Sequence, residues 1–263
     1  MNNINNITSN LNFSQNQNNG NKINDNKIAI LIPAYNEGKN IKKTINNCLK
    51  YGLDIIIVND GSTDNTKEVL KEFENKKNII IINHDINKGK GEALKTGFNY
   101  IANNNYLGVI TIDADGQHDA NEIQCFLDQL KNNNYDLIVG SRFKDTQGMP
   151  FIRKFANFFT SWIISLIAGK KIEDVQSGFR YINYDILKNI KLETKNFDTE
   201  PELILKASWY NYKIANIPIK TIYSIGEIKS HINPIVDTIK FLKLVTKSIF
   251  LKRKFLKKKV KFN

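Results

Sequence analysis

The chain has 263 residues, 41% of them hydrophobic, which fits one large globular domain with short extensions. Its two cysteines, Cys48 and Cys125, have neither CxxC spacing nor nearby His and Cys residues, which disfavours a zinc site and a disulfide framework. The net charge of +12 is concentrated in residues 236–263, where ten Lys or Arg and one Asp give +9, so a uniformly basic nucleic-acid binder is not indicated.

The first 26 residues form an Asn-rich tract with little apolar surface to bury, and we expect them to be disordered. Two N-glycosylation sequons begin at Asn6 and Asn12, but no basic start followed by an apolar core resembles a signal peptide. The chain is therefore predicted to be cytoplasmic, in a reducing compartment, without a signal peptide or a transmembrane helix.

From residue 27 onward, short apolar runs alternate with helical patterns. Strands are predicted at residues 27–33, 54–60, 78–83, 106–113 and 135–142, and helices at residues 37–50, 62–75, 90–104 and 119–134. Continuous Ile and Val runs are typical of strands that are buried on both faces. The predicted fold class is therefore α/β, with a Rossmann-like, mostly parallel sheet and helices on both faces.

Polar residues follow four of these strands at their carboxyl ends, the edge at which parallel sheets bind ligands. The polar groups are Tyr35, Asn36 and Glu37 after the first strand, Asn59 and Asp60 after the second, Asp113 and Asp115 after the fourth, and Ser141 and Arg142 after the fifth. Four such ends in one sheet favour a functional site over scattered solvated loops.

The stretch TIDADGQHD, residues 111–119, places several carboxylates close together. Asp113 and Asp115 point to the same side of an extended segment, and Gln117 continues the row. Their mutual repulsion destabilises the fold unless a positive charge lies between them. Hard oxygen ligands without His or Cys suit Mg²⁺ or Mn²⁺ when a substrate phosphate completes the shell, and a plain Asp and Gly turn is the alternative.

Two neighbouring features have structural explanations. Asp119 precedes a helix and is followed three residues later by Glu122, which matches a capping box. The Gly-flanked helix start in residues 87–97 lacks P-loop spacing. It either offers N–H groups and Lys90 to an anion or is a plain turn into a helix.

Seven motifs occur in a fixed order along the chain. They are PAYNE (33–37), VNDGSTDNT (58–66), NKGKGEAL (87–94), DADGQHD (113–119), GSR (140–142), DVQSGFR (174–180) and EIKSHINP (227–234). Together they resemble the dolichyl-phosphate or polyprenyl-phosphate mannosyl- and glucosyltransferase branch of the family 2 glycosyltransferases. The resemblance implies a GT-A fold for residues 27–232.

By position, the resemblance also implies a donor site, a metal site and catalytic residues. The donor-binding residues would be Pro33, Tyr35, Glu37, Val58, Asp60, Lys90, Asp113, Ala114, Gln176 and Lys229, with Asp60 contacting the base. Asp113, Asp115 and Gln117 would bind the metal, and Asp115, Asp174 and Arg142 would be catalytic. Glu200 and Glu202 resemble acidic positions of the family, although carboxylates in a first helical turn also suit the helix dipole.

The implied reaction moves a hexose from a nucleotide sugar, of the GDP-mannose or UDP-glucose type, to a polyprenyl or dolichyl phosphate with inversion at the anomeric carbon. Mg²⁺ or Mn²⁺ would be the cofactor. An acceptor phosphate with a second pKa of about 6 is already ionised near neutral pH. We therefore expect Asp174 to position groups rather than to take a proton.

Two segments are candidates for contact with a membrane. Residues 155–169 are uncharged but shorter than the roughly 20 residues that cross a bilayer. They form either a core helix or an interfacial one, and Phe151, Arg153, Lys154 and Trp162 favour the interface.

Residues 233–263 are predicted to form a basic amphipathic helix and tail that attach to anionic lipid on the inner face of the membrane. Lys240, Lys243, Lys247 and Lys254 fall on one stripe, and Phe241, Leu242, Leu244, Val245 and Ile249 on the other side. Packing of this helix on the domain, with a solvated basic tail, is the alternative. A membrane-protein partner or a homo-oligomer is left open, and no nucleic-acid partner is expected.

Other functions fit the sequence less well. A family 2 enzyme with a saccharide acceptor would share the donor site. A non-enzymatic basic adaptor explains the C-terminus but not the polar strand ends, and interleaved base-stacking aromatics are missing. A sugar nucleotidyltransferase would open with a Gly-rich loop, which PAYNEGKN is not.

Overall fold

The computed structural model describes residues 27–143, 151–194, 198–222, 243, 245–250 and 252, and only the backbone of residues 151–153. Three predictions fall outside these residues. They are the disorder of residues 1–26, the position of Lys229 and most of the amphipathic helix predicted within residues 233–263. In the part that is described, no helix is long and apolar enough to cross a membrane.

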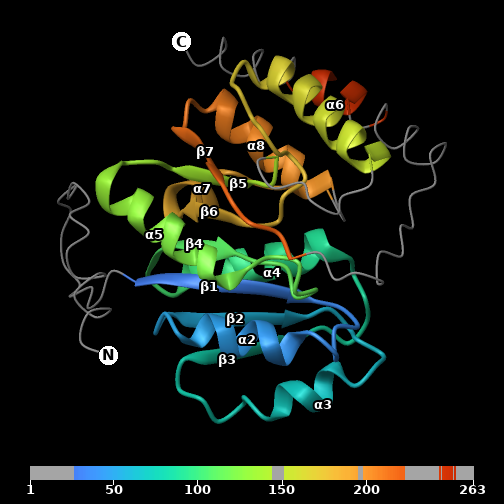
Figure 1. Ribbon diagram of the computed structural model, residues 1–263, viewed down its shortest axis with the longest axis vertical. Helices are drawn as coiled ribbons and strands as arrows, with labels where there is room; N and C mark the ends of the chain where they lie inside the picture. Colours follow the sequence, from blue (N-terminus) through green and yellow to red (C-terminus); the bar gives the residue numbers. More distant parts are fainter. Residues whose placement is uncertain are drawn as a thin grey trace.

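The described residues form a seven-stranded sheet in the order β3-β2-β1-β4-β6-β5-β7 (Figure 1). The strands are β1 (Lys27–Ala34), β2 (Asp54–Asn59), β3 (Ile79–Asn83), β4 (Tyr106–Thr111), β5 (Leu137–Ser141), β6 (Arg180–Asn183) and β7 (Ile214–Pro218). Strand β6 runs antiparallel to both of its neighbours, β4 and β5, and every other pairing is parallel. The predicted α/β class with a mostly parallel sheet is confirmed.

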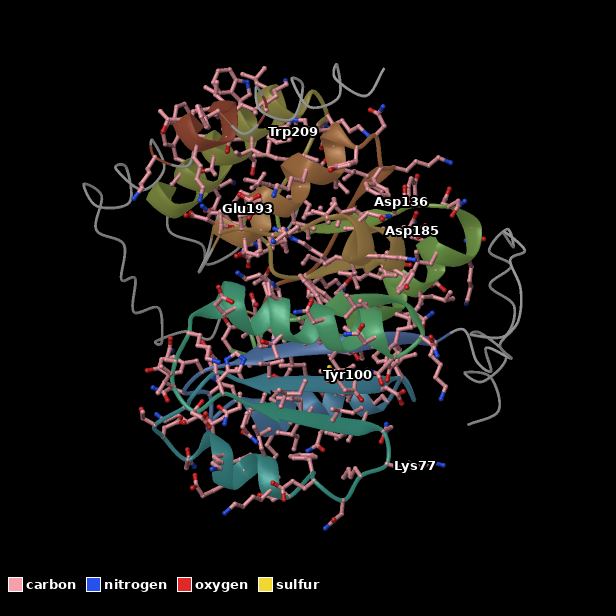
Figure 2. The ribbon with its side chains drawn as sticks, turned by 180° about the vertical axis from the view of Figure 1, so that it is seen from behind. Lys77, Tyr100, Asp136, Asp185, Glu193 and Trp209 are labelled. Carbon is pink, nitrogen blue, oxygen red and sulfur yellow. The ribbon has the colours of Figure 1, made fainter. Side chains whose placement is uncertain are left out.

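Helices cover both faces of this sheet. The helices are α2 (Ile41–Leu49), α3 (Thr66–Lys71), α4 (Lys90–Asn103), the 3₁₀ turn η1 (Ala120–Glu122), α5 (Ile123–Asn132), α6 (Phe151–Ala168), α7 (Tyr184–Asn189) and α8 (Thr199–Trp209). In β1, Ile30 packs into the core shared with α2, α3 and α5, whereas Leu31 packs into the core shared with α4, α6, α7 and α8. Figure 2 shows α4 crossing the second face of the sheet.

Several helices are shorter than the sequence predicts. Polar side chains before them bind backbone N–H groups in loop conformations, so the helices begin later. Helix α2 begins at Ile41 rather than residue 37, since Asn36 has a φ of 56° and accepts a hydrogen bond from the N–H of Thr63. Asp119 caps η1, as predicted, by accepting from the N–H of Asn121. Glu122 does not complete the capping box, because its carboxylate accepts from the thiol of Cys125.

The loop between β3 and α4 approaches the end of β2 closely at Gly61. This residue has a φ of +65°, and a Cβ there would lie 2.3 Å from the carbonyl carbon of Ile86. Gly169, which follows α6, has a similar φ of +72° but open space around it. The two positions share the same backbone conformation and differ in what surrounds them.

We expect Gly169→Ala to destabilise the fold by about 1–2 kcal/mol, which is the cost of the left-handed conformation alone. Gly61→Ala carries the same cost plus a clash with backbone that cannot rotate away, so its loss should exceed that of Gly169→Ala by about 1–3 kcal/mol. Urea unfolding of both variants measures the difference. Equal losses would contradict the close approach at Gly61.

Candidate active site

A lysine bridges two carboxylates at the carboxyl edge of the sheet. The Nζ of Lys90, the first residue of α4, lies 2.7 Å from Oδ1 of Asp113 and 2.9 Å from Oε1 of Glu200 in the first turn of α8. Burial alone would lower the pKa of Lys90, but the two carboxylates outweigh it and raise that pKa. The ammonium is therefore a permanent positive charge, and it joins α4, the end of β4 and α8.

The Lys90 bridge joins two residues with predicted roles. Lys90 was expected either to offer its charge to an anion or to begin a plain turn into a helix, and Asp113 to bind the donor or a metal. In the structure the two side chains contact each other, and both roles stay predictions. Burial acts to raise the pKa of Asp113, but the charge of Lys90 reverses this and holds it well below the usual range. The repulsion in the DADGQHD stretch is thus relieved in part by a lysine.

The negative charge of Asp115 is less well compensated than that of Asp113. Its Oδ1 accepts a hydrogen bond of 2.9 Å from the N–H of Gln117, across a turn that Gly116 makes possible with a φ of 73°. Burial and, next, the charge of Asp113 raise the pKa of Asp115. Among the described residues, neither Oδ2 of Asp115 nor the side-chain amide of Gln117 has a hydrogen-bond partner.

These two side chains fit a divalent ion that is shared with a substrate. A carboxylate with a raised pKa gains stability from a nearby cation, and the carboxylate and amide oxygens are the hard ligands that Mg²⁺ and Mn²⁺ prefer. Within the described ranges, no three His, Cys, Asp or Glu side chains are arranged to hold a metal by themselves. The residues therefore fit a site that phosphate oxygens complete, rather than a metal cage built by the protein alone.

Arg142 and Asp174 form a buried bidentate pair beside this edge. Nε and Nη2 of Arg142 lie 2.7 and 2.9 Å from the two carboxylate oxygens of Asp174, and the backbone N–H of Arg142 donates to the same carboxylate. Burial would raise the pKa of Asp174, but the hydrogen bonds from Arg142 lower it. Asp174 therefore stays ionised, as expected of a residue that positions groups. Gln176, two residues later, is exposed.

The segment from Asp174 to Arg180 is held in place by a buried arginine. The guanidinium of Arg180 donates to the backbone carbonyls of Ser177, Glu200 and Val175 at 2.6–2.9 Å. This fixes Gly178 against Asp113, where a Cβ would lie 2.4 Å from the carboxylate. Both residues lie in the DVQSGFR motif, but their roles could not be predicted, because a buried arginine that binds backbone carbonyls has no signature in the local sequence.

His118 is a further residue of the site, and no role was predicted for it. Its imidazole is buried against Phe179, with ring centroids 5.3 Å apart, and its Nδ1 lies 3.8 Å from Oδ2 of Asp113. Burial lowers the pKa of His118 more than Asp113 and Asp115 raise it. The ring is therefore neutral at pH 7 and supports the aspartates by packing. Its position in the DADGQHD motif is the feature of the sequence that could have identified it.

The residues predicted to bind a nucleotide divide into exposed and buried sets. Tyr35 is 44% exposed at the end of β1. The side chains of Pro33, Val58 and Ala114 are buried, so they can offer a ligand only their backbone. Contact of Val58 with a donor nucleotide therefore stays a prediction, and it would have to be made by the backbone.

Asp60 and Glu37 complete this part of the site. Asp60 accepts hydrogen bonds from Nδ1 of His84 and from the N–H groups of Lys88 and Gly89. Its first function is therefore to hold the loop before α4, and contact with a base stays a prediction. Burial, together with the nearby Asp115, raises the pKa of Glu37 to about 7, although a hydrogen bond from Asn40 acts in the opposite direction.

Glu200 and Glu202 have different functions, although they are two residues apart. Glu200 is bound to Lys90 through Oε1, and its buried Oε2 has no hydrogen-bond partner. Glu202 accepts from the backbone N–H groups of Glu193 and Thr194 and pairs with Lys206 at 2.7 Å. Glu202 therefore supports the fold, and Glu200 belongs to the site.

The chain is similar in sequence to known glycosyltransferases. Residues 29–191 match Glycosyl transferase family 2. The chain is 36% identical to the UDP-N-acetylglucosamine–dolichyl-phosphate N-acetylglucosaminyltransferase of Methanococcus voltae, over 76% of this chain and 87% of that protein. It is 27% identical to the dolichol-phosphate mannosyltransferase of Pyrococcus furiosus, over 73% of this chain and 55% of that protein.

A solved structure shows the same fold at low sequence identity. Glucosyl-3-phosphoglycerate synthase from Mycobacterium tuberculosis, crystallised with Mn²⁺, UDP and phosphoglyceric acid, superposes with a TM-score of 0.63 and 15% identity, over 85% of this chain and 77% of that chain. This likeness confirms the predicted GT-A fold.

We expect Asp174→Ala to destabilise the protein by about 3–5 kcal/mol, because it removes the carboxylate that forms both hydrogen bonds of the bidentate pair with the buried guanidinium of Arg142. The folded pKa of Asp174 is depressed, so its contribution is complete at neutral pH and is lost as the pH falls below the ordinary carboxyl range. The difference from wild type in urea unfolding should therefore narrow in acid. Asp174→Leu combined with Arg142→Met should recover most of the loss, and a double variant no more stable than Asp174→Ala would contradict this account.

Proposed function

Because the chain belongs to Glycosyl transferase family 2, we propose that it transfers a sugar from a nucleotide-activated donor to a polyprenyl or dolichyl phosphate. The observation that carries this proposal is the arrangement at the carboxyl edge of the sheet. There the uncommitted oxygens of Asp115 and Gln117 lie in one motif with Asp113, which is paired with Lys90.

The donor is best placed along the ends of β1, β2 and β4. Tyr35 is exposed enough to pack on a base or ribose, and Asp115 and Gln117 would hold a Mg²⁺ or Mn²⁺ ion against the diphosphate. When bound, that ion supplies positive charge for the diphosphate leaving group. The pairing of Asp113 with Lys90 keeps this region from becoming too acidic for an anionic substrate.

The acceptor chemistry needs no strong base from the protein. A lipid monophosphate has a second pKa of about 6 and attacks as an oxygen that is already anionic. Asp174 has a lowered pKa and is bound to Arg142 through both oxygens, which suits a group that orients the arginine and the loop around it. Direct attack on the anomeric carbon would invert the sugar, as the resemblance implies.

The names of the relatives support a lipid-phosphate acceptor more strongly than a particular sugar. One relative is named for N-acetylglucosamine and another for mannose, and both for dolichyl or dolichol phosphate. We therefore propose a lipid phosphate acceptor at the surface of a membrane, with UDP-N-acetylglucosamine, UDP-glucose and GDP-mannose as the donors to compare. A saccharide acceptor is the competing assignment.

Incubation with these radiolabelled donors and a short-chain polyprenyl phosphate should yield a product that partitions into organic solvent. We expect one donor to be preferred by at least about tenfold in kcat/KM, because a pocket that hydrogen-bonds one sugar leaves groups unpaired with another. Label that appears only in water-soluble oligosaccharide would assign the saccharide acceptor instead.

Chelation of divalent ions should abolish this transfer, and Mn²⁺ or Mg²⁺ should restore it. Asp115→Asn is expected to lower kcat by about 10²–10³-fold, because charge stabilisation of the leaving group is lost. Asp128→Asn, on the solvent side of α5, is the matched control and should keep wild-type activity. Full turnover of chelated wild-type enzyme would rule out a metal at Asp115 and Gln117.

A further inference from the structure

The loop between β3 and α4 is held by one buried carboxylate. Residues 85–88 are exposed, and within the described part of the chain the N–H groups of residues 85–87 donate no hydrogen bond. The N–H of Lys88 donates to Oδ1 of Asp60 at 3.0 Å, and the N–H of Gly89 donates to Oδ2 at 2.8 Å. These two hydrogen bonds tie the last residues of the loop to the end of β2.

The same carboxylate is oriented by His84. Nδ1 of His84 lies 2.6 Å from Oδ1 of Asp60, and the two side chains are 6% and 2% exposed. Because an ionised carboxylate only accepts hydrogen bonds, Nδ1 carries the proton of this bond. Nε2 lies 2.9 Å from the hydroxyl of Thr96 in α4, which can donate or accept, so both ends of the ring are held.

The loop ends at the lysine that bridges the carboxylates of the site. Gly89 precedes α4 with a φ of 93°, and Lys90 is the first residue of the helix. Nζ of Lys90 lies 2.7 Å from Asp113 and 2.9 Å from Glu200. If the N–H of Gly89 left Asp60, the start of α4 would move, and the lysine would move with it.

A second contact restricts the same loop. A Cβ at Gly61 would lie 2.3 Å from the carbonyl carbon of Ile86 and 2.4 Å from the nitrogen of Asn87. The end of β2 therefore contacts the loop in its middle through Gly61 and at its end through Asp60. Removal of the imidazole would leave the buried Asp60 with backbone partners alone, and a buried acceptor that loses a partner is destabilised.

From these contacts we propose that His84 is a positioning residue of the donor site. It fixes the carboxylate of Asp60, which holds the N–H groups of Lys88 and Gly89 and thereby sets the position of Lys90. The inference rests on the proposed function, because the ligand concerned is the nucleotide-activated donor. It goes beyond that function by giving a role to a residue that lies outside all seven sequence motifs.

A positioning role and a purely structural role change different kinetic constants. If the loop is disordered in a fraction of the free enzyme, the donor has to order it on binding. The KM for the donor then rises, while kcat at saturating donor is kept. If a substitution only unfolds part of the protein, kcat falls with the folded fraction and KM stays the same.

Two amide variants separate the two ends of the imidazole. His84→Asn places an amide nitrogen where Nδ1 lies, so it keeps the hydrogen bond to Asp60 and loses the contact with Thr96. His84→Gln reaches the position of Nε2 and loses the hydrogen bond to Asp60. Thr96→Val is the matched control, because it removes only the contact at Nε2.

The kinetic test is transfer to a short-chain polyprenyl phosphate at varied donor concentration. We expect the donor KM of His84→Gln to rise by at least about tenfold, with kcat within about twofold of wild type. His84→Asn and Thr96→Val should stay within about threefold of wild type in both constants. A fall in kcat of His84→Gln without a change in KM would overturn the proposal.

Amide hydrogen exchange measures the loop directly, in the absence of donor. The N–H groups of Lys88 and Gly89 should lose at least about tenfold of their protection in His84→Gln and keep it in His84→Asn. Exchange at Ile57, in the middle of β2, should be equal in all variants and reports that the fold is intact. Equal protection of the loop in wild type and His84→Gln would overturn the proposal.

Failure of the proposed function would be distinguishable from failure of this inference. If the wild type transfers no sugar from any of the donors, the proposed function fails. The exchange measurements need neither donor nor turnover, so they still decide whether His84 holds the loop.

Discussion

The charge balance around Lys90 is the constraint on which the site depends. One ammonium is shared by Asp113 and Glu200, so the first turn of α4, the end of β4 and the first turn of α8 are held at a fixed separation. Without it, two carboxylates would face each other beside Asp115 in a partly buried setting, where like charges repel strongly. Because one ammonium faces two carboxylates, the cluster keeps a net negative charge, to which the charge of Asp115 is added.

The part of the fold with regular patterns could be predicted from the sequence. Runs such as Ile55–Val58 are apolar at every position because both faces of the sheet are covered, and the five predicted strands are present. Strand β6 could not be predicted in this way. It has four residues and begins with Arg180, whose guanidinium binds two nearby backbone carbonyls, of Ser177 and Val175, and the distant one of Glu200.

The candidate site, like the fold, has features that could be predicted from the sequence and features that could not. The residue types and the edge of the sheet were predictable, because polar groups after buried strands gather where parallel strands end. Their partners were not, since Lys90 and Asp113 are 23 positions apart and their contact depends on how α4 packs. The burial of individual side chains could not be predicted either, because Val58 and Ala114 lie within motifs and yet face the core.

The antiparallel strand β6 also affects how the chain can be assembled during synthesis. Strands β3, β2, β1 and β4 are contiguous in sequence and can pair early, but β4 keeps an open edge until about 70 further residues have left the ribosome and β6 fills it. The aspartates after β4 therefore exist before the segment that completes their surroundings. A nascent chain of this protein passes through a stage in which β4, central in the finished sheet, has one open edge, and this is the stage at which chaperones would protect it from aggregation.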